Sequence, residues 1–204
     1  MNKIKRSISL LLMVAMIIAF SGCFKYTSTR YINTGKEQLK GLHHAEIEIE
    51  GYGTIKLELD ADVAPISVSN FVELANAGFY NGKTFFRIIN GFMMQGGRAE
   101  TEEEQKQLQT IYGEFSANGY TNNISHVAGV ISMARPDDPN GASSQFFIVH
   151  KDSTYLDGSY AAFGHVTEGM EIVNQICENT PNDGDNGSVA EEDRPVIKEI
   201  RIID

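Results

Sequence analysis

AEIEIEGYGTIKLEL occupies residues 45–59 and carries the clearest structural signal in the chain. Apolar and polar residues alternate strictly from Ala45 to Glu50 and again from Thr54 to Leu59, which is the period of a strand with one buried face. Gly51-Tyr52-Gly53 separates the two halves and is typical of a turn. The stretch therefore predicts an antiparallel β-hairpin.

Outward from the hairpin, the pattern predicts mainly short strands. They are expected near Thr84–Ile88, Phe92–Gln95, Val130–Met133, Phe146–Val149, Ala162–Val166 and Val196–Ile203. Many short strands with only two helices indicate an all-β protein, either a sandwich or a closed barrel.

Two helices are expected between these strands. The first begins at Pro65, which suits a first helical turn, and ends before Gly78, which suits a helix C-terminus. Its buried stripe is formed by Val68, Phe71, Val72 and Ala75. The second lies near Met170–Cys177, where Met170, Val173 and Cys177 share one face. Cys177 is therefore expected to be a small core residue.

Composition excludes several classes of partner. About 42% of residues are hydrophobic and 22% are charged, which is ordinary for a globular domain. The formal net charge is −10, and loss of residues 1–22 would remove Lys3, Lys5 and Arg6 and leave −13. A surface this acidic repels phosphate backbones and anionic lipids, so neither nucleic-acid binding nor charge-driven membrane docking is expected.

The first 23 residues have the form of an export signal. Three basic residues precede the apolar run 8–20, whose thirteen residues are too few for a bilayer core that needs about 20. The run ends in Phe20-Ser21-Gly22-Cys23, which resembles a bacterial lipobox apart from Phe20, where an aliphatic residue is usual. We expect cleavage after residue 22, lipidation of Cys23 and an exported, lipid-anchored protein. Secretion with a free thiol and an uncleaved anchor remain alternatives.

The chain is thus predicted to contain a signal peptide (1–22), a lipidated N-terminus with a flexible tether (23–44) and one folded domain (45–204). Residues 100–109 are polar and predict a surface loop or a short solvated helix, and 182–193 predict a loop. No metal site is expected. His43 and His44 lack a second ligand pair, and the acidic loop lacks calcium-loop spacing.

Five motifs in the predicted domain resemble those of the cyclophilin family of peptidyl-prolyl cis-trans isomerases. They are FFRIINGFMMQGG at 85–97, GVISMAR at 129–135, SSQFFI at 143–148, LDG at 156–158 and FGHV at 163–166. They occur in the family's order and spacing and span essentially 45–204. The resemblance implies a closed eight-stranded antiparallel β-barrel capped by two α-helices. It also implies isomerase activity on proline-containing peptides and unfolded exported proteins, without a cofactor.

Arg87 is the residue that the resemblance places in catalysis, and the chemistry supports it. Rotation about a peptide bond is slow because the nitrogen lone pair is conjugated into the carbonyl. In the twisted state that lone pair returns to the proline nitrogen, where a fixed cation that donates a hydrogen bond stabilises it. Gln95 matches the glutamine that holds the substrate carbonyl and orients the arginine. Because this mechanism needs no titrating base, we expect the isomerisation rate to be nearly flat from about pH 6 to 8. His126 and His165 match positions outside the pocket and are expected to be structural residues.

The resemblance also implies the walls of the substrate groove. The residues matched to substrate binding are Phe92, Met93, Ala134, Arg135, Gln145, Phe147, Tyr155, Leu156 and Tyr160. Ala134 and Arg135 match a segment that binds substrate through its backbone. Phe92 and Met93 are adjacent, so one slot can receive both only if the Asn90-Gly91 turn breaks the strand.

Three of these positions depart from the family's well-studied eukaryotic members. Arg135 replaces an asparagine, Tyr155 a tryptophan and Tyr160 a histidine. The loss of the indole N–H predicts weakened binding of cyclosporin-type inhibitors.

We expect the isomerase to be a monomer. Two other functions stay open. One is a non-catalytic binder or holdase for proline segments, and the other is a lipid-anchored structural protein that has kept the barrel. The presence of Arg87, Gln95, Phe92 and Phe147 favours turnover.

Overall fold

The computed structural model describes residues 37–184 and 186–204. The predicted signal peptide, Cys23 and most of the predicted tether therefore lie outside the described residues. Within these two ranges, none of the helices combines the length and the apolar character that crossing a bilayer would require.

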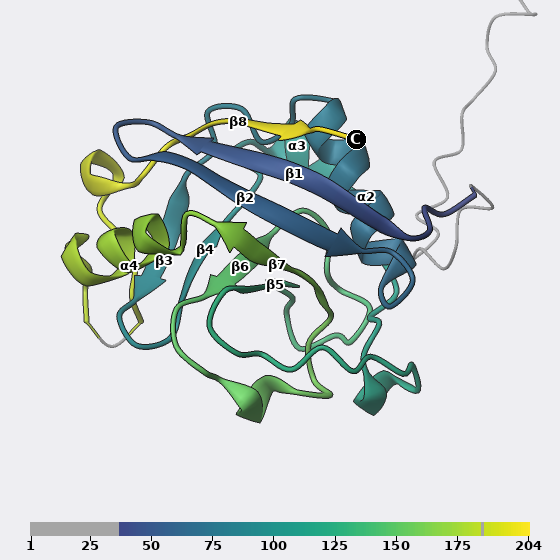
Figure 1. Cartoon of the computed structure of the whole chain (residues 1–204). Helices are drawn as coiled ribbons and strands as arrows, with labels where there is room; N and C mark the ends of the chain where they lie inside the picture. The colour runs from purple at the N-terminus through teal and green to yellow at the C-terminus, as the bar shows by residue number, and fades with distance from the viewer. Residues whose placement is uncertain (1–36, 185) are drawn as a thin grey trace, which may run out of the picture.

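Eight antiparallel strands form one curled sheet (Figure 1). The strands are β1 (Leu42–Ile49), β2 (Gly53–Asp60), β3 (Phe85–Ile89), β4 (Met93–Gly96), β5 (Val130–Met133), β6 (Phe146–Val149), β7 (Ala162–Glu168) and β8 (Ile197–Ile202). Their order across the sheet is β3-β4-β6-β5-β7-β2-β1-β8. The expected eight-stranded antiparallel architecture is confirmed.

Closure of the barrel depends on a few bonds rather than on a full ladder between the edge strands. The segment before β3 meets the segment before β8 through an isolated bridge between Thr84 and Val196. The amide of Phe85 donates to the carbonyl of Pro195 at 2.9 Å, and the amide of Ile197 donates to the carbonyl of Lys83 at 2.7 Å. These bonds satisfy part of the polar backbone that an open sheet edge would expose.

The β1–β2 hairpin has the predicted alternation, with Ile47 paired to Ile55 and both buried. β1 begins at Leu42, three residues before the alternation starts, so His43 and His44 belong to the sheet rather than to the tether. The C-terminal side chain explains the earlier start. Asp204 accepts hydrogen bonds from the His44 amide at 2.7 Å and pairs with His43 Nδ1 at 2.5 Å.

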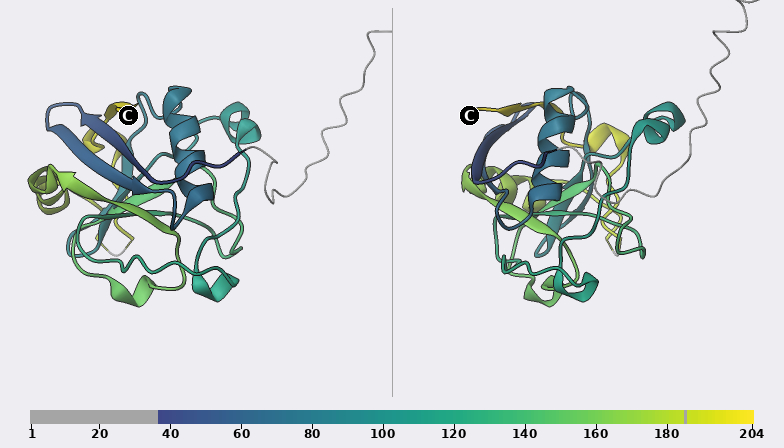
Figure 2. Two further views of the ribbon diagram at one scale, coloured as in Figure 1. Left: turned by 45° about the vertical axis from the view of Figure 1, so that its right-hand side comes forward. Right: turned by 90° about the vertical axis from the view of Figure 1, so that its right-hand side faces the viewer.

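Helices α2 (Pro65–Asn76) and α4 (Met170–Asn179) cover different ends of the curled sheet (Figures 1 and 2). Gly78 follows α2 with φ of +70°, a value that favours glycine. Its amide donates to the carbonyl of Ala75, and the amide of Phe79 donates to that of Leu74, which together form a Schellman motif. Cys177 on α4 is buried in the core, as predicted.

A third helix, α3 (Glu102–Gln107), forms in the predicted polar stretch and has no buried residue. The Thr101 side chain caps it by accepting from the Glu104 amide at 3.1 Å. Glu104 also pairs with the buried Lys83 at 2.7 Å, which ties this helix to the start of β3. The alternative of a short solvated helix is therefore confirmed for this stretch. Single turns η1 (Ser116–Asn118), η2 (Thr154–Leu156) and η3 (Glu191–Asp193) complete the described elements.

The N-terminus of α2 is capped from a distant part of the chain. Ala64 at the N-cap position makes no side-chain cap bond. Glu114 is fully buried and accepts from the amides of Ile66 and Ser67, at 2.9 and 2.8 Å, and from the Ser67 hydroxyl at 2.7 Å. Burial raises the pKa of Glu114, and these three hydrogen bonds act against that shift. The carboxylate supplies acceptors that the helix lacks locally.

Glu114→Gln is expected to lower the free energy of unfolding by about 1–3 kcal/mol. Both carboxylate oxygens are used, and the amide group that replaces one of them would face donors. Urea denaturation should show this loss. Glu168→Gln is the control, because its exposed pair with Lys56 contributes little. Equal stability of both variants would contradict the capping role.

Candidate active site

The candidate site lies on the outer face of β3, β4, β6 and β5. Arg87 pairs with Gln95 across β3–β4, Gln95 pairs with Phe147 across β4–β6, and Phe147 pairs with Ser132 across β6–β5. Cross-strand partners project to the same side of a sheet, so these four side chains form one row. Their neighbours Met94, Phe146 and Ile131 point into the barrel core.

A β-bulge in β3 turns Arg87 outward. Phe85 pairs with Gly96 and Arg87 pairs with Gln95, so Phe86 is an additional residue and the register shifts there. Phe85 and Ile88 are both fully buried although they are three residues apart, which a regular strand could not achieve. The bulge therefore places both Phe86 and Arg87 on the outer face.

Arg87 is half-buried and is held by neutral acceptors. Its Nε donates to the carbonyl of Asn186 at 2.9 Å, and its Nη1 donates to Gln95 Oε1 at 3.3 Å. Gln95 Nε2 in turn donates to Gln145 Oε1 at 2.9 Å. Among the residues that the structure describes, no carboxylate pairs with Arg87 and nothing hydrogen-bonds to Nη2. The guanidinium therefore has no described counter-ion and keeps a free donor at the surface of the site.

Beside Arg87 lies a second apolar cluster that is separate from the barrel core. Its members are Met93, Val130, Phe147, Val149, Leu156 and Ala162, with Ile89, Phe92, Ile124, Ala134 and Tyr160 packed against it. The apolar residues matched to substrate binding are thus brought together. We call this cluster the outer apolar cluster. It gives an apolar surface next to a cationic donor, a combination suited to a proline ring and its nitrogen.

The turn before β4 resolves the problem of two adjacent wall residues. Gly91 has φ of +82°, and the amide of Phe92 donates to the carbonyl of Ile89 at 3.0 Å. Met93 starts β4, while Phe92 lies in this turn. Both side chains consequently reach the outer apolar cluster, because the turn removes the alternation between them.

The structure gives Arg135 a role different from direct contact through its side chain. Its guanidinium donates to the carbonyls of Ser159, Pro136 and Asp137. It also lies 4.8 Å from the ring centroid of Tyr160. This cation–π contact and the carbonyl bonds fix the wall formed by Tyr160, whose ring meets Phe147 edge-on at 5.9 Å.

Tyr155 and Ala134 occupy the margins of the site. Tyr155 is 71% exposed, with its ring centroid 5.9 Å from that of Phe92, so it forms a rim rather than a buried wall. Ala134 donates its amide to the carbonyl of Gln145 at 2.9 Å. Its side chain packs against the outer apolar cluster.

His126 is closer to the site than its sequence position suggested. The ring is buried and stacks behind Phe147, with centroids 6.0 Å apart. Its Nδ1 bonds Asp157 at 2.9 Å and its Nε2 bonds Ser132 Oγ at 3.0 Å. Burial lowers the pKa of His126, and Asp157 opposes that shift. The ring therefore supports the back of the pocket wall. The sequence gives no local sign of this support, because the partners of His126 lie in three separate motifs.

The loop that holds Arg87 was not predicted from the sequence either. The Asn186 carbonyl accepts from Arg87, and the Gly187 carbonyl accepts from the Ile88 amide at 2.7 Å. Asp183 Oδ1 accepts from the Ser188 amide at 2.9 Å, so the carboxylate organises the loop itself. Backbone carbonyls carry no side-chain signature. The only available signal was the Asn186-Gly187 pair, a common turn sequence.

Gly187→Ala is expected to lower kcat/KM for the site's reaction about tenfold. A Cβ at Gly187 would lie 2.3 Å from Ile89 Cγ1 and 2.7 Å from the Ile88 carbonyl, so the loop must move away from Arg87. Gly184→Ala is a matched control, because Gly184 has a similar φ of +80° but no atom within 4 Å of its Cβ. Equal activity of the two variants would show that the close approach is unimportant.

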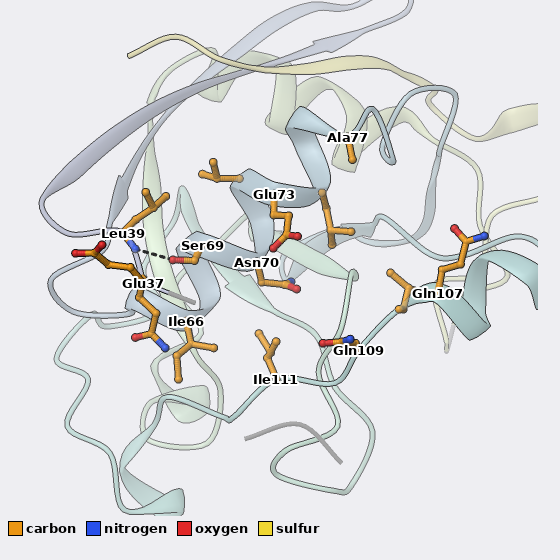
Figure 3. A pocket seen from close by; sticks show the side chains of 14 residues that line it. Glu37, Leu39, Ile66, Ser69, Asn70, Glu73, Ala77, Gln107, Gln109 and Ile111 are labelled. Atoms are coloured by element: carbon orange, nitrogen blue, oxygen red, sulfur yellow. Dashed lines mark hydrogen bonds between the residues drawn. The ribbon is translucent and has the colours of Figure 1, made fainter. Parts of the chain in front are cut away.

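A hollow lies elsewhere on the molecule, between residues 37–39, α2 and residues 107–111 (Figure 3). Its volume is about 500 Å³, and Leu39, Ile66 and Ile111 contribute apolar lining. No lysine, arginine or histidine is among the residues that line it, so it offers no cationic donor. None of the predicted site residues lines it. The described residues also contain no group of three or more side chains suited to a metal ion.

Comparison with known proteins shows the family to which the chain is similar. Residues 44–204 match the family described as cyclophilin type peptidyl-prolyl cis-trans isomerase/CLD. A peptidyl-prolyl cis-trans isomerase A from Dickeya dadantii is 36% identical over 179 residues, covering 85% of both chains. A peptidyl-prolyl cis-trans isomerase B from Bacillus subtilis is 39% identical over 146 residues, covering 72% of this chain and 93% of that protein.

Solved structures show the same architecture. The crystal structure of a cyclophilin type peptidyl-prolyl cis-trans isomerase from Cryptosporidium parvum matches with a TM-score of 0.66 and 28% identity, covering 80% of this chain and 98% of that one. A second crystal structure of that protein, in the presence of the dipeptide Ala-Pro, matches with a TM-score of 0.64 and 28% identity, covering 79% and 99%.

Proposed function

The chain belongs to the cyclophilin family of peptidyl-prolyl cis-trans isomerases, and on that premise we propose that it accelerates rotation about X-Pro bonds in exported proteins from a lipid anchor at Cys23. The observation that carries the catalytic part is the position of Arg87. Its guanidinium has no carboxylate partner among the described residues and lies beside the outer apolar cluster.

The reaction requires rotation without making or breaking a bond. The barrier of about 18–20 kcal/mol comes from conjugation of the nitrogen lone pair with the carbonyl, and it makes the uncatalysed exchange take tens of seconds or longer. A catalyst must favour the twisted amide over both planar forms. The outer apolar cluster can hold the proline ring while the acyl side turns, and Arg87 can donate to the nitrogen as its lone pair returns.

Gln95 contributes by orientation. Its Oε1 accepts from Arg87 Nη1, and its Nε2 is oriented by Gln145. The chain of bonds Gln145–Gln95–Arg87 fixes the guanidinium before substrate arrives, so little reorganisation is needed in the twisted state. We assign Gln95 and Gln145 to the wall of the groove that receives the substrate carbonyl, because both belong to this polar chain beside Arg87.

The alternative is a binder that grips proline segments without turnover. Both functions use the apolar cluster, but only turnover needs Arg87 as a donor. Exchange spectroscopy on an X-Pro peptide with residues 24–204 separates them. Accelerated cis-trans exchange supports the isomerase, whereas saturable binding with an unchanged exchange rate supports the binder.

Weak inhibition by a cyclosporin-type compound is expected in the same assay, because Tyr155 offers no indole N–H.

The lipid anchor rests on the sequence before the described residues. The apolar run 8–20 is followed by small residues and Cys23. A diacylated or triacylated cysteine holds a protein stably at a membrane, so the domain would act on proteins emerging at the outer face. Mass spectrometry of the membrane fraction should find acylated Cys23, and Cys23→Ser should release the chain. Cys177→Ser is the matched control and should stay in the membrane; a soluble wild-type product would contradict the anchor.

A further inference from the structure

His150 links the end of β6 to the turn that presents Phe92. Its amide donates to the carbonyl of Phe92 at 2.8 Å. Its Nδ1 lies 3.0 Å from the amide nitrogen of Gly91, in the same turn. The side chain itself is completely buried. His150 therefore hydrogen-bonds to both Gly91 and Phe92. The conformation of these two residues decides whether the Phe92 ring reaches the outer apolar cluster.

The Gly91 bond determines which ring nitrogen carries the proton. A backbone N–H can only donate, so Nδ1 must accept and must be unprotonated. The proton of the neutral ring is consequently on Nε2, which faces α4. Nε2 lies 3.9 Å from Glu178 Oε1, and neither Nε2 nor the buried Asn174 Oδ1 has a hydrogen-bond partner within the described part of the chain.

We propose that His150 is a positioning residue of the isomerase, which holds the Gly91–Phe92 turn against the substrate groove only while its ring is neutral. The inference rests on the proposed isomerase function and extends it to the control of Phe92. Protonation places a second N–H at Nδ1, opposite the Gly91 N–H. Two donors at 3.0 Å repel, so the turn loses the side-chain bond that fixes it.

Release of the turn has a defined consequence for the site. Phe92 packs against the outer apolar cluster and its ring lies beside that of Tyr155. The turn also joins β3, which carries Arg87, to β4, which carries Gln95. A loosened turn therefore weakens one wall of the slot and leaves the cation in place, so substrate affinity should suffer more than the bond-rotation step.

The surroundings of His150 set the direction of its titration. Burial lowers the pKa of His150, Lys151 acts in the same direction, and Glu178 and Asn174 on α4 oppose them. The ring is therefore neutral at physiological pH, and the proposed change occurs below the usual range of histidine. Because the unfolded chain takes up this proton more readily than the folded chain, acid also lowers stability through His150, and this loss begins as the pH falls through the unfolded value.

The test measures kcat/KM as a function of pH, from about pH 8 to about pH 4.5, in the wild type and three variants. His150→Asn keeps an acceptor at the δ1 position that does not titrate, and His150→Leu removes the acceptor. His165→Gln changes an exposed histidine on β7 and serves as the control. Melting temperatures at each pH ensure that only folded protein is compared.

The wild type and His165→Gln are expected to lose activity about threefold to tenfold at the acid end, mainly through KM. His150→Asn should stay nearly flat, and His150→Leu should be reduced by a similar factor at every pH. The Gly91 amide signal in nitrogen-15 spectra should move with pH in the wild type and not in His150→Asn. Identical profiles for wild type and His150→Asn would overturn the proposal, whereas absence of exchange activity in all four proteins would overturn the proposed function instead.

Discussion

Replacing Arg87 with alanine is expected to lower kcat/KM for X-Pro exchange by about 100- to 1,000-fold, the usual cost of removing one preorganised donor to a developing charge. Within residues 37–184 and 186–204 the guanidinium has no ion pair to lose, because its partners there are the Asn186 carbonyl, Gln95 and the sulfur of Met93. The free energy of unfolding should therefore change by less than about 1 kcal/mol.

Two further variants test this result: one separates the positive charge of Arg87 from its planar donor group, and the other is a control at a nearby arginine. Arg87→Lys keeps a cation but loses the planar group that bonds Asn186 and Gln95 together, so an intermediate loss is expected. Arg98→Ala removes a nearby exposed arginine whose guanidinium stacks on Phe86 at 4.3 Å, and it should leave kcat/KM within about twofold. Exchange spectroscopy on a proline peptide measures all three. If Arg87→Ala isomerises as fast as the parent, the mechanism is wrong.

Period and motif were enough to predict the sheet and to name most of the residues that the structure gathers beside Arg87. The alternation of apolar and polar residues around Ile47 and Ile55 predicted the hairpin, because one face of each strand is buried and the other faces solvent. The strands β5 and β6 lack that alternation, since both of their faces are covered. Their assignment depended on short apolar runs between turn residues, and the outer face they carry was predicted only through the resemblance to a family.

What the sequence could not predict consists of long-range or backbone-mediated contacts. Glu114 caps a helix that starts 49 positions earlier at Pro65, and its apolar neighbours gave no sign of that partner. Asn186 acts through its carbonyl, which every residue type possesses. The bulge at Phe86 adds one residue without any glycine or proline to mark it. In each case the information lies in which segments meet, and local pattern does not contain it.

The two faces of β6 predict opposite outcomes for two adjacent phenylalanines. Phe146 points into the barrel, where its ring meets those of Phe71 and Tyr80 edge-on at 5.4 and 5.5 Å. Phe147 points outward to the groove between His126 and Tyr160. Phe146→Ala should therefore lower the free energy of unfolding by about 3–5 kcal/mol, through lost burial and a cavity, while the protein that stays folded keeps its activity.

Phe147→Ala should have the reverse effect. The slot loses the ring against which proline packs, and the lost apolar contact of about 2–3 kcal/mol corresponds to a fall in kcat/KM of about 30- to 150-fold. Its cost in stability should be smaller, about 1–2 kcal/mol, because the barrel core remains complete. Urea denaturation and exchange rates per folded molecule measure both quantities for both variants. If the two variants lost stability and activity in equal proportion, the outer apolar cluster would be an extension of the core, and the assignment of the groove to this face of the sheet would fail.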